Sequence, residues 1–141
     1  NVVQNGAGKD GDFAVFGSSI LLSRMEDMLL LRTEALAVLN RVDDAVEQLN
    51  QLRVKRGLSQ VSFKKNFGED VNKLIDNIFA ERRRELIGEG HRWYDLIRRQ
   101  RILQDDPDFL VRMENGGIYW PVSEEVIRQN NLIRQNEYWN N

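Results

Sequence analysis

Apolar residues recur every three to four positions in the first half of the chain, which is the spacing of one face of a helix. The first such stripe consists of Leu21, Met25, Met28, Leu29 and Leu36, and it predicts a helix over residues 20–39. After the short break "NRVDD", a second stripe consists of Ala45, Val46, Leu49 and Leu52. It runs up to Gly57, a residue suited to the left-handed end of a helix. A loop this short makes the two helices antiparallel, so residues 20–57 are expected to form a helical hairpin.

A third apolar stripe predicts a helix over residues 69–87, and this one contains charges. Its apolar members are Val71, Leu74, Ile75, Ile78, Phe79 and Leu86. At about 100° per residue, Arg82, Glu85 and Glu89 fall within the same face. A buried charge without a partner costs several kcal/mol, so these side chains need partners nearby.

The partners are expected from the next helix. Gly88 and Gly90 end the third helix, and "HRWYDLIRRQ" begins another, which returns Arg92 and Asp95 to the charged face. We therefore predict a helix-turn-helix unit over residues 69–100. Its structural ion-pair network would consist of Arg82, Glu85, Glu89, Arg92 and Asp95.

The other segments are less regular. Residues 1–19 are glycine-rich and are interpreted as a loop, and the polar stretch "LSQVSFKKNFGED" as a connection. Residues 117–141 are expected to form an extended segment, "GIYWPV", and a tail, with one or two helical turns opened by Ser123. The fold class is thus all-α, a helical hairpin followed by further helices and irregular loops. Residues 20–141 form its single domain.

Composition excludes several functions. The 20 basic and 22 acidic residues give a net charge of −2, without the excess of Lys and Arg that nucleic-acid binding needs. The absence of cysteine excludes disulfides, thiolate metal sites and thiol nucleophiles. His91 is the only histidine, and no HExxH spacing is present, so neither a metal nor another cofactor is predicted.

Catalysis is considered for three carboxylates, Glu81, Glu85 and Glu89. Two of them at the right separation would form the acid–base pair of a glycosidase. Each has an arginine within reach, however, and such pairing opposes the raised pKa of a catalytic acid. No G-x-S-x-G elbow accompanies His91, so a serine triad is unsupported. No catalytic residue is predicted, and the chain is not expected to be an enzyme.

Paired aromatic residues are the candidates for ligand binding. Exposed aromatic rings stack on sugars or anchor partners, although packing within the core is the alternative for each of them. Trp93 and Tyr94 begin a helix, where Trp93 is expected to pack inward. The remaining pairs lie in irregular segments, where rings are freer to reach the surface. These candidates are Tyr119, Trp120, Tyr138 and Trp139.

Four stretches together resemble a known family: "RMEDMLLLRTEALAVLN", "DDAVEQLNQLRVKRG", "ERRRELIGEGHRWYDLIRR" and "WPVSEEVIRQNNLIRQNEYW". In order and spacing they are similar to the C-terminal part of the SusD/RagB-like nutrient-binding lipoproteins of Bacteroidetes. The similarity covers residues 24–138, and its most specific part is residues 81–96. It implies the C-terminal portion of a SusD-like fold, in which residues 20–57 are the last of several tetratricopeptide-like hairpins.

The resemblance also implies a role. Such proteins bind oligosaccharides at the surface of the outer membrane and deliver them to a SusC-like, TonB-dependent transporter. They are held by a lipid anchor on an N-terminal cysteine, which this chain lacks, and they are several times longer, so the resemblance implies a fragment. An intracellular helical-repeat adapter that binds a peptide or protein partner stays open as the alternative. The sequence does not identify the glycan, the location of its site or the oligomeric state.

Overall fold

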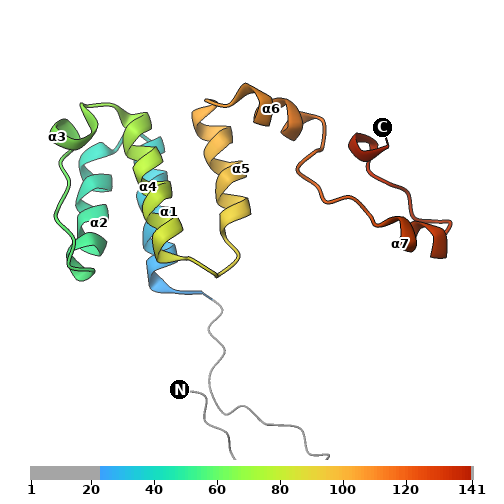
Figure 1. Ribbon diagram of the computed structural model, residues 1–141. Helices are drawn as coiled ribbons and strands as arrows, with labels where there is room; N and C mark the ends of the chain where they lie inside the picture. The colour runs from blue at the N-terminus through green and yellow to red at the C-terminus, as the bar shows by residue number, and fades with distance from the viewer. Residues whose placement is uncertain (1–22, 141) are drawn as a thin grey trace, which may run out of the picture.

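The computed structural model describes residues 23–140, and within them it is all-helical, which confirms the expected fold class (Figure 1). Its elements are α1 (Met25–Val38), α2 (Val42–Lys55), α3 (Phe63–Phe67), α4 (Val71–Glu85), α5 (Arg92–Leu103), α6 (Pro107–Glu114), α7 (Glu124–Gln129) and the 3₁₀ helix η1 (Glu137–Trp139). The loop expected over residues 1–19 lies outside the described residues. So do residues 20–22 of the first expected helix, which begins at Met25 in the structure.

The hairpin of α1 and α2 packs against α4 to form the core. Figure 1 shows these three helices side by side, with α5 next to α4. Gly57 has a φ of 70°, so it takes the left-handed conformation expected after the second helix. The buried apolar residues are Leu30, Leu36, Ala37, Ala45, Leu49, Leu52, Phe67, Leu74, Ile75, Ile78 and Phe79. The apolar stripes of the sequence therefore converge on one core.

The connection before α4 contains a short helix, α3, that the sequence interpretation missed. Phe63 and Phe67 are four residues apart, and Phe67 is buried in the core. Asn50 of α2 fixes this connection, because its side chain donates to the carbonyl and accepts from the N–H of Val61, both at 2.8 Å. Asp70 then caps α4 by accepting from the N–H groups of Asn72 and Lys73.

The segment after α5 also contains a helix that was not expected. Pro107 occupies the first turn of α6, and the Asp106 side chain caps it by accepting from the N–H of Phe109 at 3.0 Å. The extended segment expected near residue 118 is instead a turn followed by irregular backbone. Ser123 does open α7, accepting from the N–H of Val126 at 3.4 Å.

Residues 117–140 form a C-terminal arm that extends away from the helical bundle (Figure 1). The tail folds back on the start of the arm through the Gln135 side chain, which bonds both the N–H and the carbonyl of Val122. The Tyr138 ring lies so close to Gly117 that a Cβ there would sit 2.8 Å from it. Glycine is needed at that position because the ring occupies the space of a side chain.

Helix α1 carries apolar residues on two faces. One faces α2 and α4, while Met25, Met28 and Val38 are at least half exposed on the other. A surface helix of a globular protein normally has one apolar face, so a second one indicates a further packing partner. The expectation that additional helical hairpins pack here stays a prediction.

We expect Met28→Glu to leave the melting temperature of this chain nearly unchanged, since Met28 is exposed. In a longer chain that also carries preceding hairpins, the same change should lower the melting temperature by at least about 5 °C, because it buries a charge. Val111→Glu is the matched control, since Val111 lies on α6, which packs on α5, and is 54% exposed, about as much as Met28. Equal melting temperatures of Met28→Glu and the parent in the longer chain would contradict the prediction.

Candidate functional site

A buried arginine lies at the junction of α1, α4 and α5. Arg82 is 2% exposed, and its Nε lies 3.1 Å from Oδ2 of Asp95 on α5. Its Nη1 lies 2.9 Å from Oδ1 of Asp27 on α1 and donates to the Asp27 carbonyl at 3.3 Å. The Asp27 Oδ1 contact falls outside hydrogen-bond geometry, so it is mainly electrostatic. Three helices are thus joined through one guanidinium group.

The contacts continue through a second arginine. Arg98 of α5 donates to Oδ1 of Asp95 at 2.9 Å and holds Glu34 of α1 with two bonds of 2.6 and 2.9 Å. Its guanidinium also lies 5.3 Å from the centre of the Phe79 ring. We refer to the set as the ion-pair chain; its members are Asp27, Arg82, Asp95, Arg98 and Glu34. Every charge in it has an opposite partner, so its role is to position α5.

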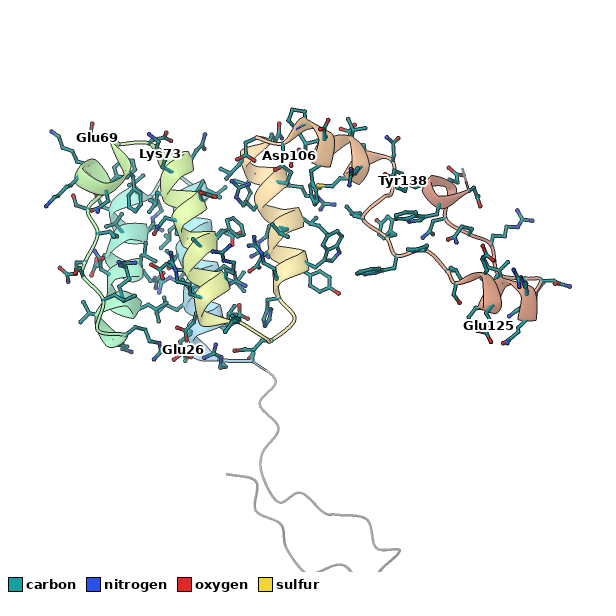
Figure 2. All side chains as sticks on the ribbon, in the orientation of Figure 1. Glu26, Glu69, Lys73, Asp106, Glu125 and Tyr138 are labelled. Atoms are coloured by element: carbon teal, nitrogen blue, oxygen red, sulfur yellow. The ribbon has the colours of Figure 1, made fainter. Side chains whose placement is uncertain are left out.

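A separate cluster joins the end of α4 to α1 and α2. Glu85 accepts from Arg56 at 2.6 and 2.9 Å and from Arg24 at 3.1 Å. Arg24 also reaches Glu89 at 2.7 Å, and Arg56 reaches Glu26, which Figure 2 labels at the start of α1, at 3.1 Å. The hydrogen bonds from Arg56, followed by those from Arg24, hold the pKa of the Glu85 carboxyl below its usual range.

The single network expected from the sequence is corrected by this arrangement. Of its five residues, only Arg82 and Asp95 contact each other. Glu85 and Glu89 pair with Arg24 instead, because α4 ends at Glu85 and the following turn carries Glu89 toward α1. Arg92 is exposed at the first position of α5 and has no ion-pair partner among residues 23–140.

The sequence interpretation missed most of the partners, which come from distant segments. These residues are Arg24, Asp27, Glu34, Arg56 and Arg98. A signal for two of them was present. Asp27 and Glu34 are seven residues apart in the first helix, so they lie on one face of it.

The environment of the three candidate acid–base carboxylates opposes catalysis. Glu81 is buried and pairs with Arg53 and Arg84. A general acid needs a raised pKa, whereas the pKa of Glu85 is lowered. His91 precedes α5 without a side-chain capping bond, and among residues 23–140 no cluster of three potential metal ligands occurs.

The four aromatic candidates divide into two pairs with different roles. Tyr119 and Trp120 are 62% and 80% exposed at the start of the arm. Trp139 donates from Nε1 to the Tyr119 carbonyl at 2.8 Å, and Tyr138, labelled in Figure 2, packs on Gly117. Tyr119 and Trp120 therefore present their rings, while Tyr138 and Trp139 fix the backbone that carries them.

Trp93 of α5 connects the exposed pair to the helical body. Its ring centre lies 6.3 Å from that of Trp120 and 6.3 Å from that of Phe109 on α6. Trp93 is half-buried, as its place on α5 led us to expect. We refer to Trp93, Tyr119 and Trp120 as the aromatic surface. Aromatic faces of this kind stack on sugar rings or anchor a protein partner.

Comparison with known proteins identifies relatives that are much longer than this chain. The model of the SusD family matches residues 14–109. The SusD-like protein P38 of Formosa agariphila is 35% identical over 131 residues, which cover 84% of this chain and 24% of that protein. The crystal structure of a SusD superfamily protein from Bacteroides thetaiotaomicron VPI-5482 matches with a TM-score of 0.77 and 58% identity. That match covers 89% of this chain and 27% of the other, so the chain spans about a quarter of the length of either relative.

We expect Arg82→Ala to lower the free energy of unfolding by about 3–5 kcal/mol, because it leaves Asp27 without its cation and the buried Asp95 with Arg98 alone. Arg83→Ala is the control, since Arg83 is the next residue of the same helix, is exposed and has no ion-pair partner within residues 23–140. Chemical denaturation followed by circular dichroism measures both. Equal destabilisation by the two substitutions would contradict the architectural role of Arg82.

We expect the stability of the chain to fall in acid partly through Glu85. A carboxyl whose pKa is lowered in the folded state contributes stability above its unfolded pKa, near 4.5, and loses that contribution as the pH falls through the folded value. Glu85→Gln should therefore cost about 1–3 kcal/mol at pH 7. The difference from the parent should shrink below pH 4.5.

Urea denaturation of both proteins between pH 7 and pH 3 measures that difference. Glu114→Gln removes an exposed carboxylate at the end of α6 and should behave as the parent does at every pH. A difference between Glu85→Gln and the parent that stays constant over this range would rule out the pH effect.

Proposed function

Because the chain belongs to the SusD family, we propose that it takes part in binding a nutrient glycan at the outer surface of the outer membrane. The observation that carries the proposal is the 58% identity to a SusD superfamily structure over 89% of this chain. In the proposed role, the intact protein hands an oligosaccharide to a SusC-like, TonB-dependent transporter. The residues described include no helix long and apolar enough to cross a membrane. Attachment through a lipid anchor is part of the proposal.

The aromatic surface supports a contribution to sugar binding. Tyr119 and Trp120 are exposed on a backbone held by hydrogen bonds from Trp139 and from Asn136, whose Nδ2 donates to the Trp120 carbonyl at 2.9 Å. A ring held in place loses little conformational freedom when it stacks on a sugar. The chain spans only about a quarter of the length of its two relatives. The full glycan site is therefore proposed to need residues beyond this chain.

Binding without hydrolysis fits the charges of the described residues. The buried carboxylates Glu34, Glu81 and Asp95 are each paired with an arginine. Hydrolysis of a glycosidic bond requires one carboxyl that is protonated near neutral pH and a second one across the bond. The proposed role of these three paired carboxylates is therefore structural.

We expect this chain alone to bind neutral oligosaccharides weakly, with dissociation constants of roughly 1 mM or above. Calorimetric titration with starch-, mannan- and mucin-type glycans measures this. Trp120→Ala should weaken any observed binding about 2- to 10-fold, because it removes one stacking ring. Leu132→Ala is the control, since Leu132 is exposed and apolar in the same arm but has no ring.

Tight glycan binding by this chain that is unchanged in Trp120→Ala would contradict the proposal that the aromatic surface contributes to that binding. A longer chain that includes the polypeptide preceding this one should bind at least one of these glycans more tightly. Its failure to bind any of them would contradict the proposed function. Reducing ends, measured in the same samples, should stay constant, and their release would contradict the non-catalytic role.

A further inference from the structure

The outer face of the α4–α5 pair contains an open cleft that the ion-pair chain does not use. Its volume is about 340 Å³, and arginines dominate its lining. From α4 it is lined by Asp76, Phe79 and Arg83, and from α5 by Arg92, Leu96 and Arg99. Arg92, Leu96 and Arg99 are spaced by four and three residues, so they form one stripe along α5. We refer to this hollow as the arginine cleft.

One of the three arginines is already neutralised. Arg99 donates to Asp76 at 2.7 Å and to the two carboxylate oxygens of Asp105 at 3.0 and 2.8 Å. These bonds lower the pKa of the Asp105 carboxyl, so it stays ionised and retains Arg99. Asp76, the only carboxylate among the residues that line the cleft, is therefore already paired with Arg99.

The other two arginines are not neutralised by the part of the chain that the structure describes. Arg83 and Arg92 are exposed, and neither has an ion-pair partner within residues 23–140. The contrast within the run of three arginines on α4 is informative. Arg82 pairs with Asp95 and Arg84 with Glu81, whereas Arg83 points to the cleft alone. Two guanidinium groups from different helices thus line one hollow with a surplus of positive charge.

The lining favours a hydrophilic ligand over a partner helix. A helix docked in a groove needs several exposed apolar residues to bury. Here Phe79 is 1% exposed, and Leu96 is half-buried. Covering Arg83 and Arg92 with an apolar surface would also remove two unpaired charges from water, at a cost of several kcal/mol for each ion. A ligand that brings its own negative charge avoids that cost.

We propose that the arginine cleft binds the anionic group, a carboxylate or a sulfate, of an acidic sugar, with Arg83 and Arg92 as the donors. A guanidinium group matches the oxygen pairs of both groups with two parallel hydrogen bonds. The acidic-sugar part rests on the proposed glycan-binding function and narrows it to charged glycans. The anion-binding part rests on the cleft alone.

The experiment titrates the full chain by calorimetry with tetragalacturonate, a sulfated carrageenan tetrasaccharide and neutral maltotetraose. We expect Arg83→Gln/Arg92→Gln to weaken binding of at least one acidic tetrasaccharide at least tenfold and to leave maltotetraose unaffected. Raising the salt from 20 to 200 mM should weaken the same interaction, since salt screens exposed charges. Comparing the two acidic ligands distinguishes a carboxylate from a sulfate preference.

The control is Arg101→Gln. Arg101 is exposed on α5 and does not line the cleft. It follows Arg92 by nine residues, or two and a half turns, so it lies on the opposite side of the helix. Because all three substituted residues are exposed, the variants should keep the parent's melting temperature. An effect of Arg101→Gln equal to that of the double variant would overturn the proposal, since general charge would explain the binding.

The outcomes separate this proposal from the glycan-binding function. If the acidic tetrasaccharides bind the double variant as well as they bind the parent, anion binding by the cleft is wrong. The proposed glycan-binding function is then unaffected. Inorganic sulfate serves as a further probe. If sulfate competes with the acidic sugars for the parent but not for the double variant, the result supports anion binding by the cleft even where no neutral glycan binds. Failure of both acidic ligands to bind the parent would overturn the cleft directly.

Discussion

A buried guanidinium group needs carboxylates, and this constraint places the second half of the structure. Arg82 is enclosed on α4, where water does not solvate it, so Asp95 and Asp27 must lie beside it. Asp95 belongs to α5, a helix whose apolar residues Leu96 and Ile97 are only half-buried. The charges, more than apolar packing, therefore fix α5 against α1 and α4. The position of the arm that follows α6 therefore also depends on these charges.

The same helix pair treats charge differently on its two faces. On the inner face, Arg82 and Arg98 are surrounded by Asp27, Glu34 and Asp95, which leaves no charge free. On the outer face, two arginines are without partners among the described residues. Ion pairs on the inner face hold the helices together, and unpaired charges on the outer face offer an attraction to something else. The structural charges and the charges proposed for recognition are thus centred only about 100° apart around each helix.

Local periodicity made the four longer helices and the left-handed Gly57 predictable, and the cost of an unpaired charge made the pairing of Arg82 predictable as well. Local periodicity did not reveal α3, because five residues are too few to show a helical period. Nor did spacing identify Arg24 as the partner of Glu85, since 61 residues separate them. The roles of Tyr138 and Gly117 depend on the tail folding back, which no local pattern indicates.

The exposed face of α1 and the arginine cleft differ in what they tolerate as a neighbour. The exposed face of α1, with Met25 and Met28, gains stability when another apolar surface covers it. The arginine cleft loses stability under the same cover, because its guanidinium groups would leave water without partners. A longer chain that packs on α1 must therefore leave the cleft open or face it with carboxylates. If it leaves the cleft open, the cleft remains available to an anionic ligand while α1 is buried in the protein.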